Sequence, residues 1–169
     1  MDASYILPFI ASTKTVFSTM LQLQVSCDKP VPQAVIPTKG RDVSGIIGMS
    51  GDVLGSIVLS FSMEPAKQIV AKFVGADVPP DSEDFGDAVG ELLNMICGGA
   101  KAKFEGKSVS ISCPSVVVGE KHKVQQMSDA LCITIPCRSD CGEFVVEVSI
   151  KEAMSSTATG PRAAASTSS

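Results

Sequence analysis

The hydrophobic positions of the chain follow two periods, one of about 3.6 residues and one of two residues. Helical spacing of apolar side chains predicts a first helix over residues 3–20. The same spacing predicts a second helix over 63–74, ended by Gly75. A third, long helix is predicted from about 84 to 104, with acidic residues in its first turn, where the helix dipole favours them.

Alternating and β-branched runs predict strands between and after these helices. The clearest signal is a hairpin, in which "DVSGIIGM" and "VLGSIVLSF" flank the turn "SGD". A short strand at 21–27 is expected before a proline-rich connection, and further strands are expected at about 109–119, 130–137 and 143–150. Because hairpins supply most of the connections, we expect an α+β domain: a largely antiparallel sheet with helices packed on one face.

The chain has the length and apolar content of a single domain, with 169 residues of which 44% are hydrophobic. Its last segment, "MSSTATGPRAAASTSS", has no apolar period and is dominated by Ser, Thr and Ala. We therefore expect one folded domain over residues 1–153 and a disordered tail over 154–169.

Charge and hydropathy exclude two classes of partner. The 14 Lys and Arg residues are scattered singly in a chain of net charge −4, so no basic stripe is available to follow the phosphates of a nucleic acid. The longest apolar runs fall far short of the roughly 20 residues that cross a bilayer. The N-terminus also lacks the features of a signal peptide, so we expect a cytoplasmic protein without a membrane partner.

Six cysteines are spread through the predicted strands and helices. Cytosolic thiols are normally kept reduced, so we expect these side chains to pack as small hydrophobic groups. Cys137 and Cys141, in "CRSDC", could form a metal site or a disulfide across a turn, but structural zinc needs four ligands. The lone histidine, His122, is expected in an exposed loop or at a strand end, which does not favour a Ser/His or Cys/His hydrolase.

The long helix carries a polar stripe along an otherwise apolar element. At about 100° per residue, the members of the stripe fall within about 80° of one another, and the apolar side chains cover the opposite side. The polar stripe consists of Asp87, Glu91, Asn94, Gly98 and Lys101. One interpretation is the solvated side of a surface helix. Glycine and asparagine are poor helix formers, however, and Gly90 and Gly98 would leave the backbone bare for close approach by another protein.

The stripe residues Asp87, Glu91 and Asn94 have the spacing D-x3-E-x2-N. This spacing is similar to the signature of the CheC/CheX/FliY group of response-regulator phosphatases. Segments along residues 5–151 resemble CheX-type sequences in the same order: "PFIASTKTVFSTML", "DVSGIIGMSGDVLGSIVLSF", "DAVGELLNMICGGAK" and "PSVVVG". The ordered set makes the resemblance far more specific than the three positions alone.

The resemblance implies a hydrolase that removes the aspartyl phosphate of a CheY-like receiver domain by inserting its long catalytic helix into the receiver active site. Asn94 would be the catalytic carboxamide and Glu91 the charged anchor, with Asp87, Gly98 and Lys101 completing the partner-binding face. No cofactor of the chain's own is implied, and Mg²⁺ is expected on the receiver. The resemblance also implies a homodimer. CheC-type relatives carry a second E-x2-N on their first helix, which "FIASTKTVF" lacks.

These side chains suit the chemistry. An acyl phosphate is already activated, so a partner has only to place a water in line with the phosphorus. The carboxamide of Asn94 can do this because it accepts and donates hydrogen bonds without titrating. Two alternatives remain: a receiver-binding adaptor that does not hydrolyse, and a dimerisation module without a receiver partner. An adaptor would need neither the carboxamide nor its register with Glu91.

Overall fold

The computed structural model describes residues 2–35, 41–126 and 129–154, and the predicted tail therefore falls, from residue 155 on, outside the described residues. The helices are α1 (Ala3–Leu21), α2 (Met63–Val74) and α3 (Glu83–Lys101), with a short 3₁₀ helix η1 (Gln33–Val35). The strands are β1 (Ser26–Cys27), β2 (Val31–Pro32), β3 (Arg41–Gly51), β4 (Val53–Phe61), β5 (Val109–Ile111), β6 (Ser115–His122), β7 (Cys132–Ser139) and β8 (Gly142–Glu152). None of the helices in these ranges is long and apolar enough to span a membrane.

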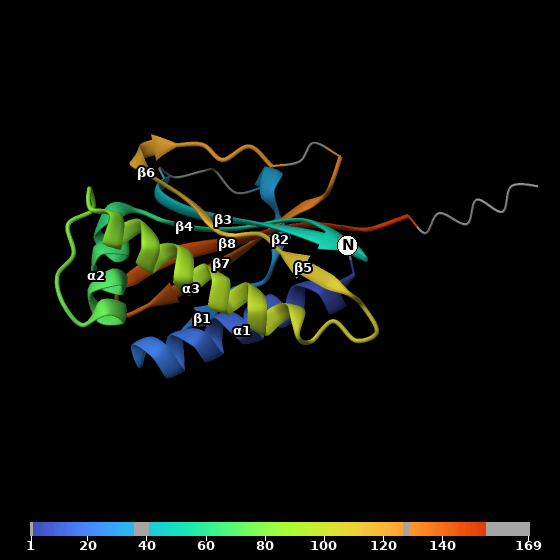
Figure 1. Cartoon of the computed structure of the whole chain (residues 1–169), viewed down its shortest axis with the longest axis horizontal. Helices are drawn as coiled ribbons and strands as arrows, with labels where there is room; N and C mark the ends of the chain where they lie inside the picture. The colour runs from blue at the N-terminus through green and yellow to red at the C-terminus, as the bar shows by residue number, and fades with distance from the viewer. Residues whose placement is uncertain (1, 36–40, 127–128, 155–169) are drawn as a thin grey trace, which may run out of the picture.

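The strands form one sheet in the order β1-β7-β8-β4-β3-β5, with β2 also pairing with β7 and β6 with β3. Every pair is antiparallel. The predicted hairpin is present as β3 and β4, whose register includes Ile47 opposite Ile57. The three helices lie together on one side of the sheet (Figure 1). The predicted α+β class, with helices on one face, is confirmed.

The core lies between the sheet and the helices. Strand residues that alternate toward the helices are fully buried, including Ile47, Ile57 and Leu59, each 0% exposed. Phe17 of α1 stacks on Phe144 of β8 with ring centroids 4.8 Å apart. Burial of these side chains is the main stabilising term, since each fully buried one contributes about 1.5–3 kcal/mol relative to exposure.

Helix α3 begins where its sequence predicts a start. The side chain of Ser82 accepts a hydrogen bond from the Phe85 N–H at 3.3 Å, and Glu83 follows at the first helical position. The predicted end near Phe104 is wrong, because the helix ends at Lys101. The chain then turns so that the Phe104 ring packs edge-on against Tyr5 of α1, at a centroid distance of 5.5 Å.

Two predicted strands differ from the observed ones. The strand expected at 21–27 is reduced to β1, because α1 continues to Leu21 and Gln22 adopts a left-handed conformation that ends the helix. The strand expected at 109–119 is divided into β5 and β6, which pair with successive parts of β3. Pro114 lies between them, where its missing N–H interrupts the ladder and its ring packs against α3.

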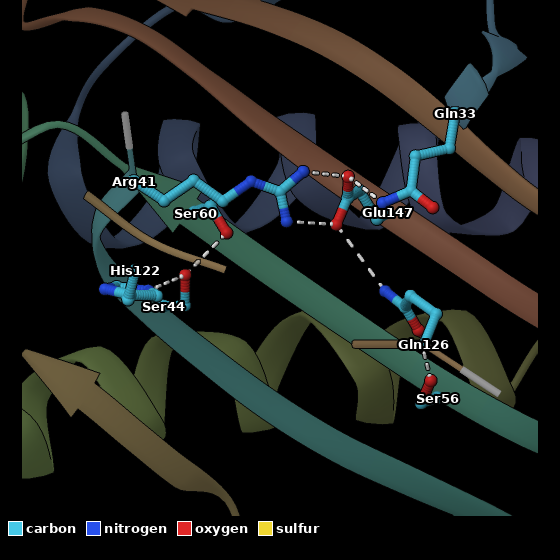
Figure 2. A network of polar contacts seen from close by, with 8 residues as sticks. All are labelled: Gln33, Arg41, Ser44, Ser56, Ser60, His122, Gln126 and Glu147. Atoms are coloured by element: carbon cyan, nitrogen blue, oxygen red, sulfur yellow. Dashed lines mark hydrogen bonds and ion pairs between the residues drawn. The ribbon is translucent and has the colours of Figure 1, made fainter. Parts of the chain in front are cut away.

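The opposite face of the sheet carries a buried polar network (Figure 2). Arg41 of β3 forms a two-bond ion pair with Glu147 of β8, and these residues are 7% and 0% exposed. Gln33 and Gln126 donate further hydrogen bonds to the Glu147 carboxylate at 3.1 and 3.5 Å. The network therefore holds Gln33 and Gln126 against the sheet.

Of the two predicted positions of His122, the strand end is confirmed and the exposed loop is wrong. His122 is the last residue of β6, and its ring is half-buried. Its Nε2 lies 2.8 Å from Ser44 Oγ, and its Nδ1 lies 2.7 Å from the Gly119 carbonyl oxygen. Both ring nitrogens are engaged in structural hydrogen bonds, at the margin of the network in Figure 2.

Because the ion pair is buried, we expect removal of one partner to destabilise the protein more than removal of both. Arg41→Met leaves the Glu147 carboxylate buried without its main counter-charge, so we expect a loss of about 3–5 kcal/mol in the free energy of unfolding. In the double variant Arg41→Met/Glu147→Leu no charge remains buried, so we expect much of this loss to be recovered. Urea unfolding of the single and double variants measures both values. A single variant as stable as the wild type would contradict the expectation.

Candidate active site on helix α3

The structure places the polar stripe on the outward face of α3. Asp87 and Glu91 are exposed, whereas Asn94, Gly98 and Lys101 are half-buried. Residues three and four apart on a helix are neighbours, so the Glu91 carboxylate and the Asn94 carboxamide stand side by side, one turn apart. The five predicted residues are thus brought to one face.

The charges of the polar stripe are not neutralised within the described part of the chain. The ion pairs formed there join other residues: Arg41 with Glu147, Lys67 with Glu64, Lys107 with Glu152, Arg138 with Asp28, and Lys151 with Asp129. Asp87, Glu91 and Lys101 therefore keep their charges available to groups brought by another molecule. A carboxylate in this condition can form a charge-assisted hydrogen bond with a lysine or arginine.

The glycines of α3 have different roles. Gly90 is buried, and a Cβ there would lie 3.0 Å from Pro114 Cγ, so this glycine allows α3 to pack closely on the chain between β5 and β6. A Cβ on Gly99 would collide with the Ser12 side chain of α1. The expectation that Gly90 bares the helix to another protein is therefore wrong. Gly98 differs, because a Cβ there would meet no atom within 4 Å, so its backbone lies open beside the polar stripe.

A groove of about 1010 Å³ runs beside the N-terminal half of α3. The groove is lined by residues of α3, of the turn before it, and of β6 with the preceding Pro114. Its acidic lining residues are Asp81, Glu83, Asp87 and Glu91, and its apolar ones include Pro80, Pro114, Val116 and Val118. The groove shares Asp87 and Glu91 with the polar stripe, so the two form one continuous surface.

The residues of this groove outside α3 were not predicted as site residues. Their position depends on β6 pairing with β3, which brings Val116 opposite Gly45 and turns it toward α3. A local signal did exist, since the run "SVVVG" is more apolar than a strand at a sheet edge requires. Val118, at the end of this run, remains 39% exposed.

The chemistry available on α3 is that of a carboxylate and a carboxamide. The cysteine nearest the stripe in the sequence, Cys97, lies on the buried side of the helix, and burial raises the pKa of its thiol to about 12. It is therefore not an activated nucleophile. No group of three His, Cys, Asp or Glu side chains able to hold a metal ion occurs among the described residues.

The sequence of this chain matches a known protein family and a characterised relative. Residues 43–138 match the family model described as chemotaxis phosphatase CheX. The CheY-P phosphatase CheX of Thermotoga maritima is 30% identical over 156 residues, covering 89% of this chain and 98% of that protein.

Solved structures similar to this chain also include CheC-like and CheX proteins. The crystal structure of a CheC-like superfamily protein from Shewanella has a TM-score of 0.81 and 32% identity, covering 89% of this chain and 99% of that one. The crystal structure of a CheX–CheY–BeF₃–Mg²⁺ complex from Borrelia burgdorferi contains a chain with a TM-score of 0.73 and 25% identity, covering 88% of this chain and 98% of that one. The protein therefore belongs to the chemotaxis phosphatase CheX family.

Proposed function

We propose that this chain hydrolyses the aspartyl phosphate of a CheY-like receiver domain by inserting α3, with Glu91 and Asn94, into the receiver active site. The proposal rests on the polar stripe, where the exposed Glu91 carboxylate and the Asn94 carboxamide stand one turn apart and Glu91 forms no ion pair with another described residue. The Thermotoga relative is named as a CheY-P phosphatase, and the Borrelia relative is found in a complex with CheY.

In this proposal Asn94 orients the attacking water. The carboxamide oxygen accepts a hydrogen bond from the water while its NH₂ donates toward the phosphoryl oxygens, which places the water oxygen in line with the phosphorus. The P–O bond to the receiver aspartate then breaks, and inorganic phosphate and a free carboxylate result. Mg²⁺ on the receiver neutralises the phosphoryl oxygens, as the composition of the Borrelia complex suggests. The chain itself contributes no cofactor.

Glu91 sets the register of the helix in the receiver. Its exposed carboxylate pairs with a receiver lysine, and this contact fixes the position of Asn94, one turn further along α3. Asp87 and Lys101 form the rim at the two ends of the polar stripe. The open backbone at Gly98 allows close approach, and the acidic groove receives the edge of the receiver beside Glu91.

In this proposal the catalytic unit is formed by residues 1–153 and contains one active site. The protein acts as a homodimer. α1 has neither Glu nor Asn and therefore no second copy of the stripe. The dimer is supported by β6, whose pairing among the described strands is with β3 alone and whose Val117 is 40% exposed. We place the activity in the cytoplasm because all six cysteines are free thiols, as in a reducing compartment.

Asn94→Ala tests the catalytic step. We expect its unfolding midpoint to match the wild type, while the rate of receiver dephosphorylation falls on the order of 100-fold, because a positioned hydrogen-bonding group is lost from the transition state. Asn94→Gln keeps the amide but adds a methylene, so we expect partial recovery. The measurement is single-turnover decay of the phosphorylated receiver with Mg²⁺ present. If Asn94→Ala binds the receiver and dephosphorylates it as fast as the wild type does, the polar stripe is only a docking surface.

Glu91→Ala tests the anchor. We expect it to weaken association with the receiver more than Asn94→Ala does, because a lysine–carboxylate contact contributes to binding while a water-orienting amide acts mainly in the transition state. Titration calorimetry with the receiver measures both affinities. Glu143→Ala, which removes an exposed carboxylate from β8, is the matched control and should bind like the wild type. If both Glu91→Ala and Asn94→Ala bind the receiver with the affinity of the wild type, Glu91 is not the anchor.

A further inference from the structure

Two cysteines separated by 110 residues lie directly opposite each other in the sheet. Cys27 of β1 is the register partner of Cys137 of β7, and their sulfur atoms are 3.1 Å apart. The spacing in "CRSDC" offers Cys141, which lies in the turn between β7 and β8, as another possible partner of Cys137. The structure pairs Cys137 with Cys27 instead.

The backbone around the pair has the geometry that a disulfide needs. The Asp28 N–H donates to the Pro136 carbonyl oxygen at 2.8 Å, so residues 28 and 136 form a hydrogen-bonded pair. Pairs alternate along an antiparallel ladder, which makes Cys27 and Cys137 a non-hydrogen-bonded pair, with Cα atoms about 4.5 Å apart. This separation falls within the range found in disulfides. Both side chains point toward the helices, where they join the edge of the core.

The two thiols differ in exposure and in the direction in which their pKa is shifted. Cys27 is half-buried, and the hydrogen bond from the Cys137 thiol lowers its pKa, with a further contribution from the positive charge of Lys14. The same hydrogen bond and burial raise the pKa of Cys137, which is 3% exposed. A more acidic, accessible thiol beside a buried one is the arrangement of an attacking cysteine and its resolving partner.

The other cysteines lack this combination. Burial raises the pKa of Cys97 to about 12 and that of Cys132 to about 11, and it also raises the pKa of Cys141. Cys113 is exposed. Within the described residues, the contact between Cys27 and Cys137 is the one that brings two sulfur atoms together.

We propose that Cys27 and Cys137 are a redox modification site, at which hydrogen peroxide converts the two thiols into a reversible disulfide between β1 and β7. The Cys27 thiolate attacks one peroxide oxygen, the O–O bond breaks, and the released hydroxide takes up a proton to form water, leaving a sulfenic acid on Cys27. The Cys137 sulfur then attacks the Cys27 sulfur and displaces a second water. Two thiols and one peroxide thus give one disulfide and two waters, and a dithiol reductant reverses the reaction by exchange.

The disulfide would reinforce a weak edge of the fold. β1 has two residues, and Pro136, on the strand beside it, has no N–H to donate toward it. A covalent bond across 110 residues restricts the unfolded chain strongly. It also fixes the chain that follows α1, the helix that holds α3 through the hydrogen bond from Ser12 Oγ to the Ile96 carbonyl oxygen at 2.7 Å.

The test uses the full chain with and without hydrogen peroxide. We expect oxidation to remove two of the six thiols, to lower the intact mass by two hydrogen atoms, and to yield a peptide linked through Cys27 and Cys137. The melting temperature should rise by about 10 °C and return to its original value with a dithiol reductant. Cys27→Ala should abolish the mass loss and the shift, whereas the control Cys141→Ala should retain both.

Cys137→Ala separates chemistry from stability. In this variant Cys27 has no resolving partner, so we expect its sulfenic acid to accumulate and to be trapped by a dimedone-type reagent, whether or not the variant is less stable than the wild type. No loss of thiols in the wild type, a linkage that involves another cysteine, or a disulfide between two chains would each overturn the proposal.

Discussion

The rotation of α3 about its own axis is the constraint on which the rest of the site depends. Three contacts set it, and each needs a small residue at one position. A Cβ on Gly45 of β3 would lie 3.2 Å from Leu93, a Cβ on Gly90 would lie 3.0 Å from Pro114, and one on Gly99 would strike Ser12. At about 100° per residue, Gly99 and Gly90 lie on opposite sides of the helix, so the contacts with Ser12 and Pro114 limit rotation of α3 in both directions. The polar stripe is therefore held outward by packing on its opposite side.

The two faces of the sheet stabilise the molecule by different means. The helical face buries a continuous apolar core, while the opposite face buries an ion pair satisfied by glutamine side chains. Such a network contributes little net energy but is costly to break, so it defines where the segments around Gln33 and Gln126 lie. The polar stripe lies on the helical side of the sheet, where Asp87 and Glu91 are exposed to solvent.

Local periodicity predicted the elements that depend on local interactions. The 3.6-residue pattern predicted α3 and its outward residues, because amphipathicity reflects which side a helix buries. The hairpin of β3 and β4 followed from two alternating runs around a short turn. What could not be predicted depends on pairing between distant segments. The groove needs β6 beside α3, the role of Gly90 needs Pro114 against it, and the proximity of Cys27 and Cys137 needs β1 to pair with β7 across 110 residues.

We expect α3 to enter the receiver with Asn94 facing the phosphoryl group. A crystal structure of this chain bound to a Mg²⁺-loaded receiver carrying beryllium trifluoride would show this contact. In such a complex the Asn94 carboxamide should lie within hydrogen-bond distance of a water in line with the beryllium–oxygen bond, and the Glu91 carboxylate should pair with a receiver lysine. A complex in which the receiver contacts another face of the chain, with the polar stripe left in solvent, would contradict it.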